Sequence, residues 1–252
     1  MKDTTIIYGK NAIIEALENE EREFNKILIS NNARADAKIE QIKKLALQKG
    51  IVFQFVAKEK LNSIEPDGRH QGVIAQIAPI KYYDLDEFIE KHKGELSSVV
   101  LLDGVEDSHN VGAIIRSCVC AGIKGVIIPS RRGVLINSTV EKTSAGATSH
   151  ISIIKVNSPV SAIQKLKENN YWVIASDHHA EHNHYEIDYT DMNFVLIMGA
   201  EHAGISKSLL KLADYKVKIP MLTNFNSLNV SNATAIILFE YVSQLCKKNN
   251  KK

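Results

Sequence analysis

The sequence predicts an α/β protein in two parts, the larger of which is built on a mostly parallel β-sheet. From residue 98 onward, short runs of apolar and often β-branched residues recur, and amphipathic segments separate most of them. Residues 1–80 alternate helical and strand patterns over a shorter stretch. The chain has 252 residues, of which 44% are hydrophobic, so it is long enough to bury a substantial core.

The first part, residues 1–80, is predicted to form a small α/β domain. We expect helices at residues 11–18 and 35–48, and strands at residues 26–30, 51–56 and 73–77. Gly50 favours termination of the second helix, because glycine readily adopts the left-handed conformation found at helix ends. Residues 81–96 are rich in charged side chains and are predicted to be a linker with one helix at residues 85–91.

The second part, residues 97–252, contains the candidate parallel strands. They are predicted at residues 99–102, 125–128, 151–156, 172–176, 194–198 and 215–219. A long helix is expected to follow and to end at about Cys246. Ligands of such sheets bind beyond the carboxyl ends of the strands, so the loops that follow the strands are the candidate functional regions.

Composition excludes several classes of protein. No apolar run approaches the ~20 residues of a membrane-spanning helix, and residues 1–9 lack the apolar core and cleavage site of a signal peptide. Three cysteines cannot make a disulfide framework and suit a reduced, cytoplasmic protein. The net charge of +2 does not indicate nucleic-acid binding, because the balance without the four C-terminal lysines is −2.

Residues 103–116 follow the first predicted strand of the second part and begin a helix. Asn110 is expected to be the N-cap, since asparagine is among the best capping residues. An apolar stripe begins at Val111, and Arg116 projects about 140° away from it at 100° per residue. A solvated surface arginine and a ligand-binding arginine both fit this position beside a polar loop.

Residues 199–206 form a loop of mostly small residues after the strand at residues 194–198. Gly199 and Gly204 have the spacing of a P-loop, but isoleucine and serine follow where a P-loop needs lysine and a hydroxyl residue. The chain also has no Gly-x-Gly-x-x-Gly dinucleotide motif. The loop can hold backbone groups and Glu201 against a ligand, or it can be a tight turn whose glutamate complements a helix dipole.

Two clusters of polar side chains leave alternatives open. Between the last strand and the long helix, capping needs one residue, whereas the segment offers Asn226, Ser227, Asn229 and Ser231. A ligand site at the free N–H groups of the helix start is the alternative to capping alone.

Further upstream, a metal site and a hydrated loop both fit His178, His179, His182 and His184, but their spacing matches no zinc pattern and we expect no metal.

Residues 103–116, 199–206 and 219–240 together resemble the SpoU/TrmH family of RNA 2′-O-ribose methyltransferases in the SPOUT superfamily. Residues 8–12 and 70–73 resemble the substrate-binding module, similar to ribosomal protein L30e, of bacterial 23S rRNA guanosine 2′-O-methyltransferases. The resemblance implies an L30e-like domain at residues 1–80 and a trefoil-knotted SPOUT domain at residues 97–252. Knots are rare exceptions among chain connections.

The resemblance also implies a cofactor, partners and site residues. The methyl donor would be S-adenosylmethionine, the substrate RNA, and the assembly a homodimer through the knotted domain, with no DNA or membrane partner. The implied cofactor-binding residues are Gly199, Ala200, Ile219, Met221 and Leu228. The implied catalytic residues are Asn110, Arg116, Glu201, Ser227 and Asn229.

The resemblance assigns a role to each catalytic residue. Arg116 would clamp the target phosphate and stabilise the developing oxyanion, since a guanidinium is a poor proton acceptor. Direct acceptance of the 2′-hydroxyl proton by Arg116 is the costlier alternative. Asn110 would orient Arg116 or the ribose, and Glu201 would fix the arginine or its own loop. Ser227 and Asn229 would form hydrogen bonds to the cofactor or the substrate.

The implied reaction transfers a methyl group to a ribose 2′-hydroxyl, with a guanosine of 23S rRNA as the expected target. A tRNA methyltransferase and a catalytically silent RNA-binding or ribosome-assembly factor are the alternatives. The sequence departs from the family pattern at Ser108 and His202, where proline and glycine are usual. It also departs at Thr223 and Asn232, where glycine and valine are common. These departures bear on cofactor affinity more than on catalysis.

Overall fold

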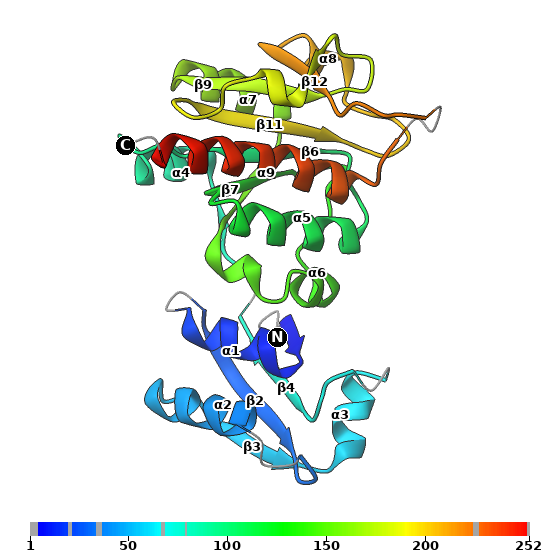
Figure 1. Cartoon of the computed structure of the whole chain (residues 1–252). Helices are drawn as coiled ribbons and strands as arrows, with labels where there is room; N and C mark the ends of the chain where they lie inside the picture. Colours follow the sequence, from blue (N-terminus) through cyan, green and yellow to red (C-terminus); the bar gives the residue numbers. More distant parts are fainter. Residues whose placement is uncertain are drawn as a thin grey trace. The chain divides into compact units, whose positions relative to one another are not determined.

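The computed structural model describes residues 5–19, 22–33, 37–66, 69–78, 80–223 and 227–250. The chain folds into two compact units, each with its own sheet (Figure 1). Unit 1 consists of Met1–Lys81 and Ile136–His150, and unit 2 of Tyr82–Leu135 and Ile151–Lys252.

Unit 1 contains a mixed sheet with the strand order β1-β4-β2-β3. Only the β2–β3 pair is parallel. The strands are β1 (Thr5–Tyr8), β2 (Phe24–Ser30), β3 (Phe53–Val56) and β4 (Val73–Ile77). The helices are α1 (Lys10–Glu18), α2 (Ala37–Gln48), α3 (Lys58–Ile64), α6 (Ser138–Thr143) and the 3-10 helix η1 (Ala147–His150). Residues of α1 and α2 form the main core with one face of the sheet, and Leu61 of α3 packs with Leu28 and Ile74 on the other face.

The two segments of unit 1 that carry the family resemblance lie together. Gly9 has a φ of +92° and precedes α1, whose first residue, Lys10, donates its backbone N–H to Gln71 Oε1 at 3.2 Å. His70 is 1% exposed and is held by two hydrogen bonds. Its Nδ1 accepts from the Gly72 N–H at 2.9 Å, so its Nε2 carries the proton donated to Asn62 Oδ1 at 2.9 Å.

Unit 2 contains an eight-stranded sheet in the order β10-β12-β9-β11-β6-β7-β8-β5, and every adjacent pair is parallel. The strands are β5 (Tyr82–Tyr83), β6 (Val99–Asp103), β7 (Gly125–Pro129), β8 (Ser152–Val156), β9 (Tyr171–Ser176), β10 (His182–Asn183), β11 (Asn193–Gly199) and β12 (Tyr215–Lys218). The helices are α4 (Leu85–Lys91), α5 (Ser108–Cys120), α7 (Pro159–Glu168), α8 (Lys207–Leu210), α9 (Val230–Asn249) and the 3-10 helix η2 (His184–Glu186). The predicted parallel α/β sheet is therefore confirmed.

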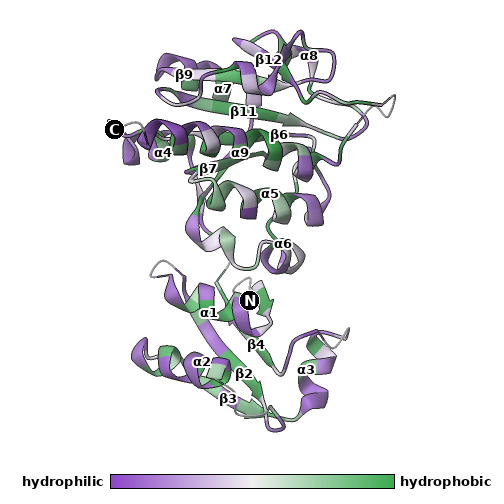
Figure 2. Cartoon of the chain, viewed as in Figure 1, coloured by the Kyte–Doolittle hydropathy of each residue, from purple (hydrophilic) through white to green (hydrophobic). Residues whose placement is uncertain are grey.

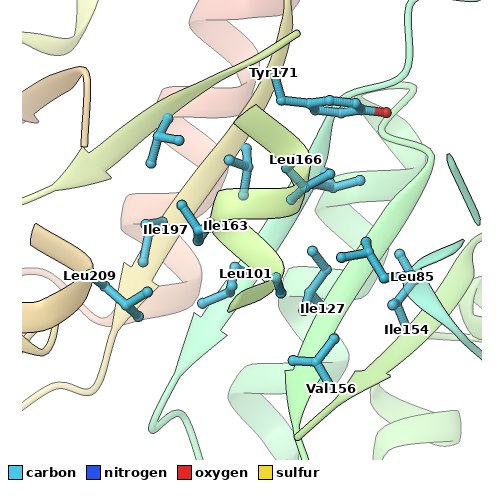
Figure 3. Packing of buried hydrophobic residues seen from close by; sticks show 14 of the residues in the cluster. Leu85, Leu101, Ile127, Ile154, Val156, Ile163, Leu166, Tyr171, Ile197 and Leu209 are labelled. Carbon is cyan, nitrogen blue, oxygen red and sulfur yellow. The ribbon is translucent and has the colours of Figure 1, made fainter. Parts of the chain in front are cut away.

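Helices cover both faces of this sheet. On one face, Ile163 and Leu166 of α7 pack on Leu101, Ile127 and Ile197 of the central strands (Figure 3). Helices α5 and α9 pack side by side on the other face (Figure 1). The central strands are hydrophobic throughout, as buried parallel strands require (Figure 2).

Two segments differ from their expected places. Residues 82–91 are not a linker, because β5 pairs with β8 and the side chains of Leu85 and Phe88 join the core of unit 2. The segment Ile136–His150 belongs to unit 1 instead of the second part of the chain. There, Arg22 Nη2 lies 2.5 Å from Glu141 Oε1, and the two side chains are 8% and 2% exposed. The division of function between a substrate-binding and a catalytic domain stays a prediction.

Most predicted elements are present with ends shifted by one or two residues. Elements missed in the sequence are short, such as β5 and β10, or largely exposed, such as α3. Residues 35 and 36, at the expected start of α2, lie outside the described residues. Within the described ranges, no helix is long and apolar enough to cross a membrane. Burial raises the pKa of the Cys118 thiol, so this cysteine behaves as a small hydrophobic core residue.

Candidate active site

The candidate site lies where neighbouring strands β6 and β11 end. Asp103 and Gly199 are register partners at the carboxyl ends of these strands, so the loops that follow leave the sheet side by side. Asp103 ties the two loops together. Its carbonyl oxygen accepts from the Ala200 N–H at 3.0 Å, and its Oδ2 accepts from the Ser206 N–H at 2.7 Å.

The β11 loop is closed tightly on itself. The Gly204 N–H donates to the Ala200 carbonyl at 2.9 Å, and Gly204 has a φ of +63°. A Cβ atom at Gly199 would lie 2.3 Å from the Gly204 carbonyl carbon and 2.5 Å from the Ile205 nitrogen. Only glycine fits at position 199, because the opposing atoms belong to the backbone and cannot rotate away.

The N-cap of α5 is Asp107, so the prediction that Asn110 caps this helix is wrong. The carboxylate of Asp107 accepts from the N–H groups of His109 and Asn110 at 3.3 and 3.0 Å. Asn110 is the third residue of the helix, and its side chain is therefore available for another use. Ser108 occupies the first helical position, where proline is favoured for its fixed φ, which explains why proline and serine both suit this site.

Three predicted site residues from three separate segments form one hydrogen-bonded triangle, which we call the amide–carboxylate triangle. Glu201 Oε1 accepts from Asn110 Nδ2 at 3.1 Å and from Asn229 Nδ2 at 2.9 Å. Asn229 Nδ2 also donates to Asn110 Oδ1 at 2.8 Å. The triangle joins the start of α5, the β11 loop and the start of α9.

The N-cap of α9 fixes the direction of every bond in the triangle. Asn229 is that N-cap, and its Oδ1 accepts from the N–H groups of Ser231 and Asn232. Because Oδ1 is committed to the helix, Nδ2 must face the triangle, and Asn110 must then turn its Oδ1 toward Asn229. The predicted capping and site roles of Asn229 are thus compatible in one side chain.

Arg116 and Ser227 are not brought into the triangle. Arg116 is exposed on α5 and makes no hydrogen bond or ion pair with the described part of the chain. Ser227 is exposed, and its hydroxyl likewise has no partner within the described ranges. Asn226, another candidate cap, lies outside the described residues. The catalytic roles of Arg116 and Ser227 therefore stay predictions.

The predicted cofactor-binding residues line the same edge of the sheet. Gly199 and Ala200 are half-buried at the end of β11, and Ile219 and Leu228 are half-buried in the segment between β12 and α9. Met221 is 40% exposed. The edge thus combines the compact β11 loop with apolar side chains beside the amide–carboxylate triangle.

His202 and the upstream histidines differ in their surroundings, and their positions bear on the departures from the family pattern and on the question of a metal site. His202 is exposed and is absent from the residues with positive φ, so the backbone at this position does not require glycine. His178 and His179 stack on each other, and His182 lies 3.4 Å from Glu186. In the described part of the chain, no group of three or more His, Cys, Asp or Glu side chains is arranged to hold a metal ion.

Sequence reasoning missed two acidic residues that shape the site. Asp103 connects the loops and Asp107 starts α5. Asp107 could have been found, because aspartate caps as well as asparagine and stands three residues before Asn110. Asp103 could not, because its partner Ser206 lies 103 residues away in the sequence.

Known proteins resemble this chain over almost its whole length. Residues 97–239 match the model of the SpoU rRNA Methylase family, and residues 6–83 match the model described as RNA 2′-O ribose methyltransferase substrate binding. A relative from Staphylococcus saprophyticus, named as a TrmH family tRNA/rRNA methyltransferase, is 38% identical over 237 residues, which cover 93% of this chain and 94% of the relative.

Two solved structures share the whole architecture. The AdoMet-bound rRNA methyltransferase from Sinorhizobium meliloti has a TM-score of 0.81 at 25% identity and covers 96% of this chain and 88% of its own. The SpoU methyltransferase AviRb from Streptomyces viridochromogenes, in complex with AdoMet, has a TM-score of 0.82 at 23% identity. That match covers 97% of this chain and 91% of the AviRb chain, and it shows a shared fold.

Proposed function

The chain belongs to the SpoU family of S-adenosylmethionine-dependent RNA methyltransferases, and we propose that it methylates a ribose 2′-hydroxyl of ribosomal RNA. The amide–carboxylate triangle is the observation that carries the proposal. It holds three loops from distant parts of the sequence in one arrangement at the carboxyl edge of the sheet. Binding sites of parallel sheets are built at this edge.

The residues at this edge fit the cofactor. S-adenosylmethionine supplies an electrophilic methyl group on a sulfonium when it is bound. Gly199 lets the backbone of Gly204 and Ile205 pack against the end of β11, which gives the loop beside the site its compact shape. Ile219, Met221 and Leu228 offer apolar contacts of the kind that line small-molecule sites.

Arg116 contacts the RNA, and the amide–carboxylate triangle holds the loops around it in place. The exposed Arg116 guanidinium donates to the target phosphate and to the 2′-oxygen as negative charge develops there. The triangle keeps Asn110 in a fixed orientation on the same helix, with its Oδ1 and Nδ2 both occupied. Glu201 bonds to the two asparagines, so its role is to fix the loops of the triangle and not Arg116.

Ribosomal RNA, and a guanosine of 23S rRNA in particular, is the proposed target. Unit 1 supports this choice, because residues 6–83 match a substrate-binding domain and the Gly9 and Gln71 segments meet at one end of α1. A tRNA ribose is the second candidate, since the S. saprophyticus relative is named for both substrates. Recognition of a 2′-hydroxyl selects RNA over DNA. A ribosomal RNA substrate supports the expected cytoplasmic location.

We also propose that two copies associate through unit 2, which we expect to carry the trefoil knot. Ile236 and Phe239 stand one turn apart on α9 and are 39% and 48% exposed, which leaves apolar surface for a partner. A second copy is the occupant implied by the resemblance. Light scattering should give the mass of a dimer for the wild type and of a monomer for Phe239→Glu; a wild-type monomer would exclude this assembly.

Methyl transfer from labelled S-adenosylmethionine tests the proposed activity. The wild type should label 23S rRNA from a strain lacking this enzyme and should leave tRNA unlabelled. Labelled tRNA with unlabelled rRNA would instead establish the second candidate. Calorimetry with S-adenosylmethionine distinguishes the methyltransferase from a catalytically silent RNA-binding factor. The silent factor would bind RNA, but it would not bind S-adenosylmethionine or transfer a methyl group.

Arg116→Ala tests the catalytic arginine. Removal of a group that stabilises an oxyanion costs about 100-fold or more in turnover, so this variant should lose activity while it keeps its affinity for S-adenosylmethionine. Arg116→Lys is the matched control, because it keeps the charge and loses the bidentate geometry. Full activity in Arg116→Ala would exclude the assigned role.

A further inference from the structure

The loops at the carboxyl edge of the large sheet are acidic or uncharged, with one exception. The loop at residues 103–107 carries Asp103, Glu106 and Asp107, and the loop at residues 199–206 carries Glu201. Neither loop contains lysine or arginine. The segment from β12 to α9 has no charged residue, and the loop after β9 contains two acids. The loop after β7 is the exception and carries Arg131 and Arg132.

This placement matters for a polyanionic substrate. RNA carries one negative charge for each phosphate, so the acidic loops repel the strand that must enter the site. Within the described part of the chain, Arg131 and Arg132 are both exposed and have no hydrogen-bond or ion-pair partner. Their charges are therefore available to a ligand.

The Arg131–Arg132 loop, defined as residues 130–135, starts beside the candidate site. Strand β7 is the direct neighbour of β6, and its register places the end of β7 level with Asp103. Adjacent strands lie ~5 Å apart, so this loop leaves the sheet about one strand spacing from the β6 loop. That separation is comparable to the distance between neighbouring nucleotides of an RNA strand.

The backbone of the loop is held in an uncommon conformation. The Ser130 N–H donates to the Val156 carbonyl at 2.8 Å, which anchors the start of the loop to β8. A Cβ atom at Gly133 would lie 2.2 Å from the Pro129 carbonyl oxygen, so the loop folds back closely on the end of β7. Arg132 has a φ of +60°, which non-glycine residues rarely adopt. The tight backbone presents two arginines at fixed points.

We propose that Arg131 and Arg132 bind the phosphates of the RNA strand next to the methylated nucleotide. The inference rests on the proposed function, and it adds a positioning site for the substrate backbone on the β7 loop. The two guanidiniums offset the charge of the acidic loops and set where the strand crosses the edge. They contact phosphate and not the reacting atoms, so they govern RNA affinity while turnover at saturating RNA depends on the triangle and Arg116.

Arg131→Ala/Arg132→Gly is the variant that tests this site. Glycine relieves the left-handed conformation at position 132, so the loop should keep its fold. We expect the KM for RNA to rise at least about 10-fold, with little change in kcat or in S-adenosylmethionine affinity. The salt dependence of RNA binding should weaken, with a slope smaller by ~0.7–0.9 for each phosphate that the variant no longer neutralises.

Lys124→Ala is the matched control. Lys124 is exposed at the amino end of the same strand, on the opposite edge of the sheet. The Lys124→Ala variant should leave the KM for RNA and the salt slope of RNA binding unchanged. The Arg131→Lys/Arg132→Lys variant keeps both charges and should retain most of the salt slope. An unchanged KM and slope in the double variant, or an equal loss in Lys124→Ala, would overturn the proposal. If the wild type transfers no methyl group, only the proposed function is refuted. The affinity for RNA and its salt dependence still test the role of Arg131 and Arg132 in that case.

Discussion

Replacing Asn229 with aspartate changes one atom of the side chain and isolates the amide–carboxylate triangle from the helix cap. Asparagine and aspartate cap helices about equally well, so the introduced carboxylate still accepts from the start of α9. Its second oxygen then faces Glu201 Oε1 and Asn110 Oδ1, which stand 2.9 and 2.8 Å from Nδ2 in the wild type. Two donated hydrogen bonds become one charge repulsion and one contact between lone pairs.

The magnitude follows from these distances. Two unit charges 2.9 Å apart repel by about 1.4 kcal/mol in bulk water and by about 6 kcal/mol at an effective dielectric constant of 20. Because Asn229 and Glu201 are exposed, the lower figure applies. The lost hydrogen bond to the charged Glu201 adds about 1.5 kcal/mol, and the lost bond to the neutral Asn110 amide adds about 1 kcal/mol. The arrangement of the three loops is therefore weakened by about 4 kcal/mol, which corresponds to a roughly 1,000-fold loss of kcat/KM.

Activity and thermal unfolding together test this reasoning. Asn229→Asp should lose activity while its Tm stays near that of the wild type, because exposed loops can separate without unfolding the sheet. Asn229→Ala loses the cap as well, at a cost of about 1 kcal/mol, and its Tm should fall by about 2–4 °C. Asn229→Asp/Glu201→Gln restores one carboxylate and two amides in the triangle and should regain part of the lost activity. Wild-type activity in Asn229→Asp, or no recovery in the double variant, would refute the role of the triangle.

Two further predictions concern unit 1. Burial and the charge of Lys58 lower the pKa of His70, while Glu65 acts in the opposite direction. The folded state therefore favours the neutral imidazole. The stability of the folded protein should fall as the pH drops below ~6.5, where the unfolded chain binds the proton more readily. Urea unfolding at pH 5 and 7.5 should show a smaller pH difference in His70→Gln than in the wild type, and equal differences would contradict the prediction. Glu141→Gln leaves the buried charge of Arg22 without its partner and should destabilise the protein by about 3 kcal/mol. Arg22→Met/Glu141→Leu should recover most of this loss in the same unfolding assay, and a double variant as unstable as Glu141→Gln would show that the ion pair is not the cause.

The sequence by itself determined the class of fold and indicated the edge of the sheet that carries the candidate site. Apolar runs located the central strands to within one or two residues, because a strand buried on both faces must be apolar throughout. The polar residues after β6, β11 and β12 marked the edge of the candidate site, since parallel strands end at one side of a sheet. The long C-terminal helix was equally visible from its apolar pattern, whereas the choice of Asn229 as its cap among four polar candidates came from the structure.

Only the tertiary structure decided how these pieces act together. The contacts of the triangle join residues 28, 91 and 119 positions apart, and no local pattern records such distances. The structure moved the α5 cap from Asn110 to Asp107, which released the Asn110 side chain for the site. It also set the strand order that places the Arg131–Arg132 loop beside β6. Periodicity reports which face of an element is buried, whereas the choice of its neighbour depends on the packing of the whole sheet.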